Sequence, residues 1–365
     1  STKDVNVLVQ LDRLEDKKTR RFLITKGGGY ERDCLEIFGE TNTGDPKVLE
    51  DFLTWSTERY PAERYCLILW NHGSGWWEEA RSRAAVPKSP GVRSLRTRSR
   101  ASLFHHNTNA TGHSTHRSIC YDDTSGGDAL DNSELKNVLA RACTVIGKKI
   151  DILGMDACLM TMVEVAWQLR DSVEILVGSE IEEPNDGWPY AEILQFLTAK
   201  PKSKTHVVAK EVVKQYVASY RDRDETVAQS AINTSATETI IRALIPLTAE
   251  LLSDLDKNRK LIQWAWERAP KFYDDNYLDL YAFARKLRTK SKDRDRIREK
   301  ADALIATLKT GKTKSILCQG RLGKEVAGTK GLSIYFPADS INPAYRRLDF
   351  AIDAQWAVFL ERYLG

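Results

Sequence analysis

Short β-rich runs alternate with helical patterns along most of this chain, and the alternation limits what it can fold into. Runs with strand character are "VNVLVQLD", "FLITK", "YCLILWN", "KIDILG", "EILVGSE" and "VAQSAIN". Apolar residues recur at helical spacing in "PKVLEDFLTWSTERY", "NSELKNVLARAC", "LMTMVEVAWQLR" and "THVVAKEVVKQYVASY". This order predicts an α/β fold in which helices cover both faces of a largely parallel sheet.

The pattern changes in the last third of the chain. From residue 236 to about residue 308 it is almost wholly helical, and strand character returns near residues 314–319 and 331–337. We therefore predict an α/β core over residues 1–235 and a mainly helical C-terminal subdomain over residues 236–365. A chain of 365 residues with 42% hydrophobic residues is long enough to bury a core of this size.

Charge and cysteine content argue against several classes of protein. The 55 basic residues nearly balance the 51 acidic ones, so the net charge of +4 gives little general attraction to nucleic acid. No run approaches the roughly 18 apolar residues that cross a bilayer, and the chain does not open with a signal-peptide pattern. Six scattered cysteines form no CxxC pair, which predicts neither a zinc site nor a disulfide framework.

One segment, residues 78–118, differs from the rest. Between Arg81 and Arg117 there is no Asp or Glu, and Ser, Pro, Asn, Gly and Thr separate eight basic residues. This composition predicts an exposed, mobile insertion. A rival interpretation is that the insertion binds nucleic acid or another anionic partner, or that it holds a metal on His105, His106, His113, His116 and Cys120. Only one aromatic residue is present to stack bases, and the histidine spacing matches no zinc pattern, so we predict neither.

Two predicted strands end in residues that can do chemistry. "YCLILW" runs into residues 71–73 (Asn-His-Gly), and "KIDIL" runs into residues 154–158 (Gly-Met-Asp-Ala-Cys). Loops that follow neighbouring parallel strands meet at one edge of a sheet. We expect a helix to begin at Cys158, which would place its sulfur near the positive end of the helix dipole and favour the thiolate.

A thiol and a histidine at one sheet edge suit nucleophilic catalysis. His72 would take the proton of Cys158 and later protonate the leaving group. Gly73 leaves room for a substrate carbonyl, whose oxyanion the nearby backbone N–H groups, including that of Cys158, would bind. The alternative is that Cys158 is a buried core thiol and His72 a turn residue.

Longer stretches of the chain carry a resemblance to a known family. "LILWNHGSGW" and "DILGMDACLM" resemble the two signature blocks of the clostripain-like cysteine peptidases, family C11, in the clan that includes caspases, legumains and gingipains. The similarity extends to "NVLVQLDR", "GDPKVLEDFLTW", "CYDDTSGGDALDNSELKNVL", "EEPNDGWPY", "KGLSIYFP" and the closing "YRRLDFAIDAQWAVFLERYL". It implies a caspase-like α/β/α sandwich, a His72/Cys158 catalytic dyad and an oxyanion site at Gly73 and Cys158.

The resemblance also implies cleavage after basic residues. The family's acidic residue that faces the basic P1 side chain corresponds to Asp156, and Asp186 is a second candidate for this pocket. A carboxylate beside the nucleophile raises the thiol pKa by like-charge repulsion, a cost that a substrate cation offsets. An arginine would add bidentate pairing. The alternative for Asp156 is a loop residue that bonds its own backbone.

Family members mature by cleavage between the dyad residues, so we predict autocleavage after one or more of Arg93, Arg96, Arg98 and Arg100. The expected product is a monomer that is nicked into two associated chains. The resemblance alone suggests that it is extracellular or lies in the cell envelope. Its partners would be protein or peptide substrates, with no nucleic acid and no membrane span. We expect no required cofactor, although some family members need Ca²⁺. The acidic turn "YDDTSGGD" is a candidate for that ion or for turn formation. The alternative function is an inactive relative that binds an anionic partner.

Overall fold

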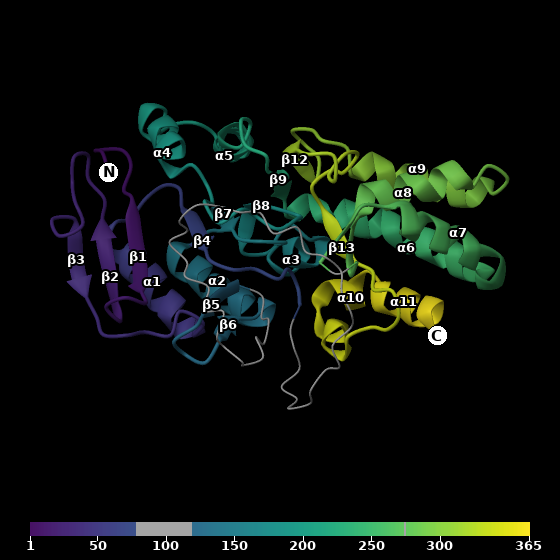
Figure 1. The fold of residues 1–365 in the computed structure, drawn as a ribbon, viewed down its shortest axis with the longest axis horizontal. Helices are drawn as coiled ribbons and strands as arrows, with labels where there is room; N and C mark the ends of the chain where they lie inside the picture. Colours follow the sequence, from purple (N-terminus) through teal and green to yellow (C-terminus); the bar gives the residue numbers. More distant parts are fainter. Residues whose placement is uncertain (78–118, 274) are drawn as a thin grey trace.

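A computed structural model describes residues 1–77, 119–273 and 275–365 (Figure 1). Its centre is a five-stranded sheet in the order β12-β9-β8-β7-β4. The strands are β4 (Cys66–Trp70), β7 (Ile150–Asp156), β8 (Val173–Gly178), β9 (Val227–Asn233) and β12 (Ile316–Leu322). Every residue of β7 is buried, because helices cover both faces of the sheet beside it.

The central sheet is mixed. β4, β7 and β8 pair in parallel, whereas β9 runs antiparallel to both β8 and β12. The predicted α/β class is therefore confirmed, but the parallel arrangement holds for only three strands. The chain passes from β8 to β9 through two helices, α4 (Tyr190–Ala199) and α5 (Thr205–Ser219), and this connection brings it back to the sheet from the opposite end.

Two apolar clusters pack against opposite faces of the central sheet. One contains residues of α4 and α5, and the other contains residues of α1 (Pro46–Arg59), α2 (Asn132–Ile146), α3 (Val163–Gln168) and the C-terminal helices. Neighbouring residues of β8 divide between them, since Leu176 belongs to the larger cluster and Val177 to the smaller. Figure 1 shows the resulting layers, with α4 and α5 above the sheet and α2 below it.

The boundaries of α2 show how local sequence sets these elements. Asp131 accepts a hydrogen bond from the N–H of Glu134, whose side chain accepts one from the N–H of Asp131. Gly147 ends the helix at φ 78°, a left-handed conformation that glycine adopts without steric cost. These two signals fix α2 directly before β7.

Three small sheets flank the core. One consists of β1 (Leu8–Arg13), β2 (Lys18–Leu23) and β3 (Cys34–Ile37), and another of β5 (Ile119–Asp122) and β6 (Asp128–Leu130). The third consists of β10 (Lys271–Phe272), β11 (Tyr277–Asp279) and β13 (Ser333–Tyr335). In Figure 1 the first lies at the N-terminal end of the molecule, away from the C-terminal helices.

The C-terminal part is mainly helical. Its helices are α6 (Glu238–Ser253), α7 (Leu255–Arg268), α8 (Leu280–Lys290), α9 (Asp295–Thr307), α10 (Asp349–Asp353) and α11 (Trp356–Leu364), with short 3₁₀ turns at Ser235–Thr237 and Pro343–Arg347. β12 returns to the central sheet beside β9, and the larger apolar cluster contains residues from both sides of residue 235. The division of the chain at residue 235 stays a prediction.

Candidate active site

The ends of β4 and β7 form one wall of a pocket. The two strands are parallel neighbours, with Trp70 beside Asp156, and the N–H of Asn71 donates to the carbonyl of Asp156 (3.3 Å). The residues that follow the two strands therefore lie together. The pocket at this edge is lined by Trp70, Asn71, His72, Asp156, Ala157, Cys158, Glu183, Pro184, Asn185 and Gly187.

The backbone at Cys158 differs from the prediction. No helix begins there: β7 ends at Asp156, and α3 begins only at Val163. The intervening segment bonds to the loop after β8, through Leu159 N–H to the carbonyl of Ile181 (3.0 Å) and Thr161 N–H to that of Ser179 (2.9 Å). Its apolar residues are buried on all sides rather than along one helical face, so their spacing was misleading.

The Cys158 thiol lies in an environment that favours its neutral form. Burial raises the pKa of this thiol to about 11, and the carboxylates of Glu182 and Asp156 add to the shift. Two hydrogen bonds oppose the shift: the N–H of Glu183 donates to Cys158 Sγ (3.3 Å), and the backbone of Cys158 itself bonds to the sulfur. The thiolate expected from a helix dipole is therefore not supported, since the helix that follows β7 begins only at Val163.

His72 also lines the pocket and is exposed. Its backbone N–H donates to Asn71 Oδ1 (2.6 Å), which also accepts from the N–H of Tyr121 (2.9 Å). The ring of Tyr121 meets the imidazole edge to face, with 6.5 Å between the centroids. Asn71 and Tyr121 thus fix the turn that presents the imidazole to the pocket.

Gly73 packs directly on the Cys158 backbone. A Cβ atom at this position would lie 2.5 Å from the carbonyl oxygen of Cys158 and 2.9 Å from Met160 Sδ. We expect Gly73→Ala to destabilise the fold by about 1–3 kcal/mol and to lower peptidase activity, since the backbone at Cys158 must shift. Denaturant unfolding and peptide turnover check this. Gly29→Ala, whose Cβ would meet nothing within 4 Å, is the control, and equal behaviour of the two variants would contradict the prediction.

Asp156 is a buried carboxylate at the base of the pocket, with 3% of its surface exposed. Its Oδ2 accepts hydrogen bonds from the N–H of Trp188 (3.0 Å) and the hydroxyl of Tyr190 (2.7 Å). Burial nevertheless raises its pKa. Gly187 covers the carboxylate at φ +61°, and a Cβ there would lie 2.8 Å from Asp156 Oδ2, so only glycine leaves this group open.

Glu183 is a pocket residue that the sequence reasoning missed. Its side chain hydrogen-bonds with Asp156, its backbone contacts Cys158 Sγ, and burial together with the Asp156 charge raises its pKa well above the usual range. It lies within "EEPNDGWPY", a stretch that the family resemblance had already singled out. The sequence reasoning had instead named Asp186, because it lies in the loop after the strand "EILVGSE".

Other predicted site residues fall elsewhere. The Asp186 carboxylate forms an ion pair with Arg223, both groups are about half exposed, and Asp186 is not among the residues that line the pocket. Residues 93, 96, 98 and 100, expected to be cleaved, lie outside the described residues, as do the four histidines of the rival metal cluster. Cys120 is described, and burial raises its pKa to about 12.

A sequence profile of the clostripain family, Peptidase C11, matches residues 1–90 and 103–363. The chain belongs to the clostripain family. Clostripain from Hathewaya histolytica is 28% identical over 170 residues, which are 44% of this chain and 26% of that protein. This chain thus matches about a quarter of the length of that curated relative. The resemblance stated from the signature blocks is confirmed.

Solved structures of clostripain-family proteases share the fold. A secreted C11 cysteine protease from Bacteroides thetaiotaomicron, in complex with an irreversible peptide inhibitor, is 19% identical, with a TM-score of 0.64 over 97% of this chain and 89% of that one. An inactive zymogen C11 protease from Parabacteroides distasonis is 17% identical, with a TM-score of 0.64 over 96% and 87% of the two chains. The predicted caspase-like fold class is confirmed.

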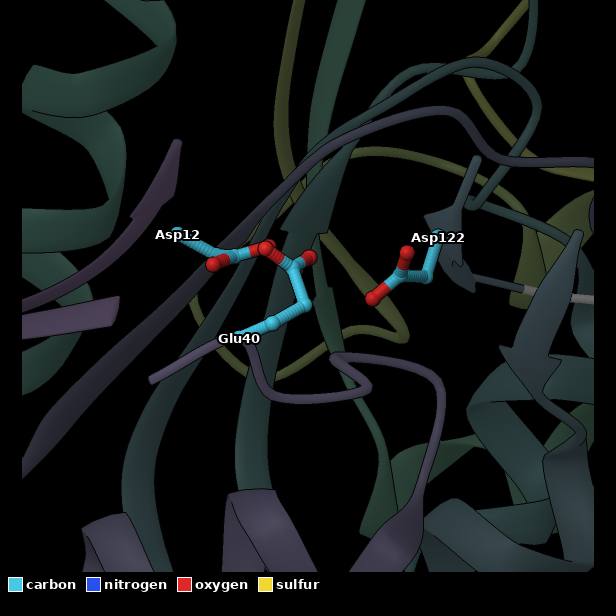
Figure 2. Close-up of side chains that lie close together, drawn as sticks. All are labelled: Asp12, Glu40 and Asp122. Atoms are coloured by element: carbon cyan, nitrogen blue, oxygen red, sulfur yellow. The ribbon is translucent and has the colours of Figure 1, made fainter. Parts of the chain in front are cut away.

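The acidic turn that was a candidate for Ca²⁺ contributes to a cluster of carboxylates. Oxygens of Asp12, Glu40 and Asp122 lie within 4.8 Å of one another, and Figure 2 shows the three side chains turned toward a common point. Oxygen-only ligands suit Ca²⁺. Asp122, however, accepts hydrogen bonds from the N–H groups of Thr124 (2.9 Å) and Ser125 (3.0 Å), so it does form the turn.

Within the described part of this family member, no helix is both long and apolar enough to cross a membrane.

Proposed function

We propose that this protein is a cysteine endopeptidase that cleaves after basic residues, with His72 and Cys158 as its catalytic dyad. The observation that carries the proposal is the pocket at the ends of β4 and β7, where a histidine, a thiol and a buried carboxylate meet. Membership of the clostripain family supports the same chemistry. An inhibitor-bound relative of the same fold is described as a secreted cysteine protease.

The reaction follows from the groups on the pocket walls. His72 takes the Cys158 proton, and the thiolate attacks the carbonyl carbon of the scissile bond. The backbone N–H groups at Gly73 and Cys158 bind the oxyanion. The C–N bond then breaks, and His72 returns its proton to the departing amine. Water, deprotonated by His72, hydrolyses the thioester and regenerates the thiol.

The raised pKa of the thiol has a consequence for this mechanism. At neutral pH a thiol with a pKa of about 11 is almost wholly protonated. Proton transfer to His72 must therefore accompany substrate binding rather than precede it. A cationic P1 side chain beside Asp156 assists, because it offsets a negative charge that raises the thiol pKa.

Peptide hydrolysis tests the proposed function. Purified protein would be assayed on fluorogenic peptides that differ only at P1, with Arg, Lys, Asp or Leu. We expect turnover of the Arg peptide above that of Lys, and little or none of the Asp and Leu peptides. No turnover of any peptide, before and after limited proteolysis, would favour the alternative. In that case the protein is an inactive relative that uses the eight basic residues between positions 81 and 117 to bind an anionic partner.

Autocleavage in the basic insertion is a second expected property. We expect the wild-type protein to separate into two fragments under denaturing conditions, and Cys158→Ala to remain one chain. The later fragment should begin directly after an Arg or Lys, among residues 93–100, because tethering presents this basic segment to the dyad at high effective concentration. N-terminal sequencing checks the site. Identical nicking of Cys158→Ala would show that another protease makes the cut.

The two fragments should stay associated under native conditions. β4 of the earlier fragment pairs with β7 of the later one over residues 66–70 and 152–156. Trp76 is fully buried, with its ring against those of Tyr335 and Tyr345 (4.7 Å between centroids in each pair). Size-exclusion chromatography of the nicked protein should therefore give a single monomeric peak. By analogy with the secreted relative, we propose an extracellular or cell-envelope location.

A further inference from the structure

The base of the pocket holds two carboxyl groups rather than one. Glu183 and Asp156 are hydrogen-bonded through their side chains, and both line the pocket. A hydrogen bond between two carboxyl groups needs one proton, since two ionised carboxylates have only acceptors. Burial and the neighbouring Asp156 charge favour a protonated Glu183, so this pair would carry one negative charge rather than two.

The remaining contacts leave room for a cation at this pair. Asp156 Oδ2 already accepts from Trp188 and Tyr190. The Gln229 side-chain amide has one orientation in which both its nitrogen and its oxygen form hydrogen bonds. In that orientation it donates to Glu183 Oε1 (3.2 Å) and accepts from Trp188 Nε1 (3.0 Å). Glu183 Oε2 is buried and has no amide or hydroxyl donor in the described part of the chain. The Trp188 side chain also hydrogen-bonds with Glu183, so Glu183 Oε2 is the oxygen left for an incoming donor.

We propose that Glu183 is a specificity-determining residue of the P1 pocket and that a cationic P1 side chain displaces the proton it shares with Asp156. This inference rests on the proposed peptidase function. The planar guanidinium of arginine has five N–H donors, enough to bridge both carboxylates. The lysine ammonium is a compact point charge that matches such a pair less well. Binding of Arg converts the Glu183 carboxyl to a carboxylate and releases one proton to solvent.

Several titratable or charged groups surround this pair. Cys158 and His72 lie on the pocket walls, and Glu182 and Asp186 lie on the loop after β8. The groups on or beside the covering helices are Tyr190, Tyr216, Tyr220 and Arg223. Burial raises the pKa values of all three tyrosines, so they stay neutral across the range in which the pair titrates. The experiment must also separate the contribution of the dyad.

The sign of the pH dependence follows from the shared proton. Burial raises the pKa values of both groups, and the Asp156 charge raises that of Glu183 further, so the proton is held at low pH and lost as pH rises. Binding of Arg therefore strengthens with pH. The Arg/citrulline ratio of kcat/KM should rise by up to about tenfold for each pH unit over the titration of the pair. Citrulline has nearly the shape of arginine without its charge.

The experiment compares this ratio between about pH 5 and pH 9 in three proteins. Titration of the dyad affects both substrates equally and cancels in the ratio. In the wild type we expect the ratio to rise with pH. In Glu183→Gln, where the amide still donates to Asp156, we expect a flat and lower ratio. Glu182→Gln changes an exposed carboxylate one residue away and should keep the wild-type slope.

Proton release gives a measurement that does not depend on turnover. Calorimetry on Cys158→Ala in buffers of different ionisation enthalpy counts the protons released when the two peptides bind. We expect about one proton for the Arg peptide and none for citrulline. A flat wild-type ratio, or equal proton release by both peptides, overturns the role of Glu183. Failure of the wild type to cleave any peptide instead overturns the proposed function, so the two failures are distinguishable.

Discussion

Replacement of Cys158 by alanine is expected to abolish peptide hydrolysis, with a loss of about four orders of magnitude or more. The sulfur is the nucleophile in the proposed mechanism, and no other thiol of the described residues lines the pocket. His72→Ala should cost nearly as much, because a thiol with a pKa of about 11 needs a base to form the thiolate. Steady-state kinetics on the Arg peptide, with circular dichroism to confirm folding, provides the measurement.

Cys34→Ala is a matched control for this prediction. Cys34 is also a half-buried free thiol, but it lies on β3 and its sulfur donates to the carbonyl of Glu36 (3.5 Å), outside the pocket. It should retain wild-type kinetics and autocleavage. Activity that survives in folded Cys158→Ala would exclude Cys158 as the nucleophile and leave the pocket without a peptidase mechanism.

Asp156→Asn is expected to remove most of the preference for basic P1 residues. Asparagine keeps the shape of the side chain but leaves a bound guanidinium without its buried counter-charge. Breaking a buried ion pair from one side costs about 3–5 kcal/mol, so kcat/KM for the Arg peptide should fall by at least about a hundredfold. Turnover of the citrulline peptide should change much less, and the ratio of the two separates lost specificity from lost catalysis.

Asp186→Asn is the corresponding control, because the Asp186 carboxylate is paired with Arg223 rather than placed on the pocket lining. We expect its Arg/citrulline ratio to stay within a few-fold of the wild type. The opposite result, in which Asp186→Asn loses the Arg preference and Asp156→Asn keeps it, would contradict this assignment. It would mean that Asp186 binds the P1 side chain and that the loop after β8 rearranges when substrate binds.

The sequence alone was enough to predict that His72 and Cys158 lie at one edge of the sheet. Each lies two residues beyond the end of an apolar strand, and these two strands, β4 and β7, pair in parallel, so their carboxyl ends meet. The signature blocks then pointed to the clostripain family, which the profile match bears out. Local rules were sufficient for these inferences because both residues depend only on where a single strand ends.

Local patterns misled where burial came from all sides. Leu159, Met162 and Val163 are spaced as on a helix face, yet the backbone before Val163 bonds to the loop after β8 and Leu159 adopts φ 67°. Periodicity reports a single buried face and cannot distinguish a helix from an irregular segment that is enclosed by the core. The same limit applies to β9, whose direction depends on the two-helix connection from β8.

The composition of the P1 pocket was decided only by tertiary structure. Whether Glu183 or Asp186 approaches Asp156 depends on how the loop after β8 crosses the end of β7, and contacts between distant residues fix that path: Ile181 with Leu159, Glu183 with Cys158, and Asp186 with Arg223. Glu183 and Asp186 are three residues apart in one loop, and no local pattern in the sequence shows which of the two carboxylates is buried. Only the fold buries the Glu183 carboxylate beside Asp156 and leaves that of Asp186 half exposed, paired with Arg223.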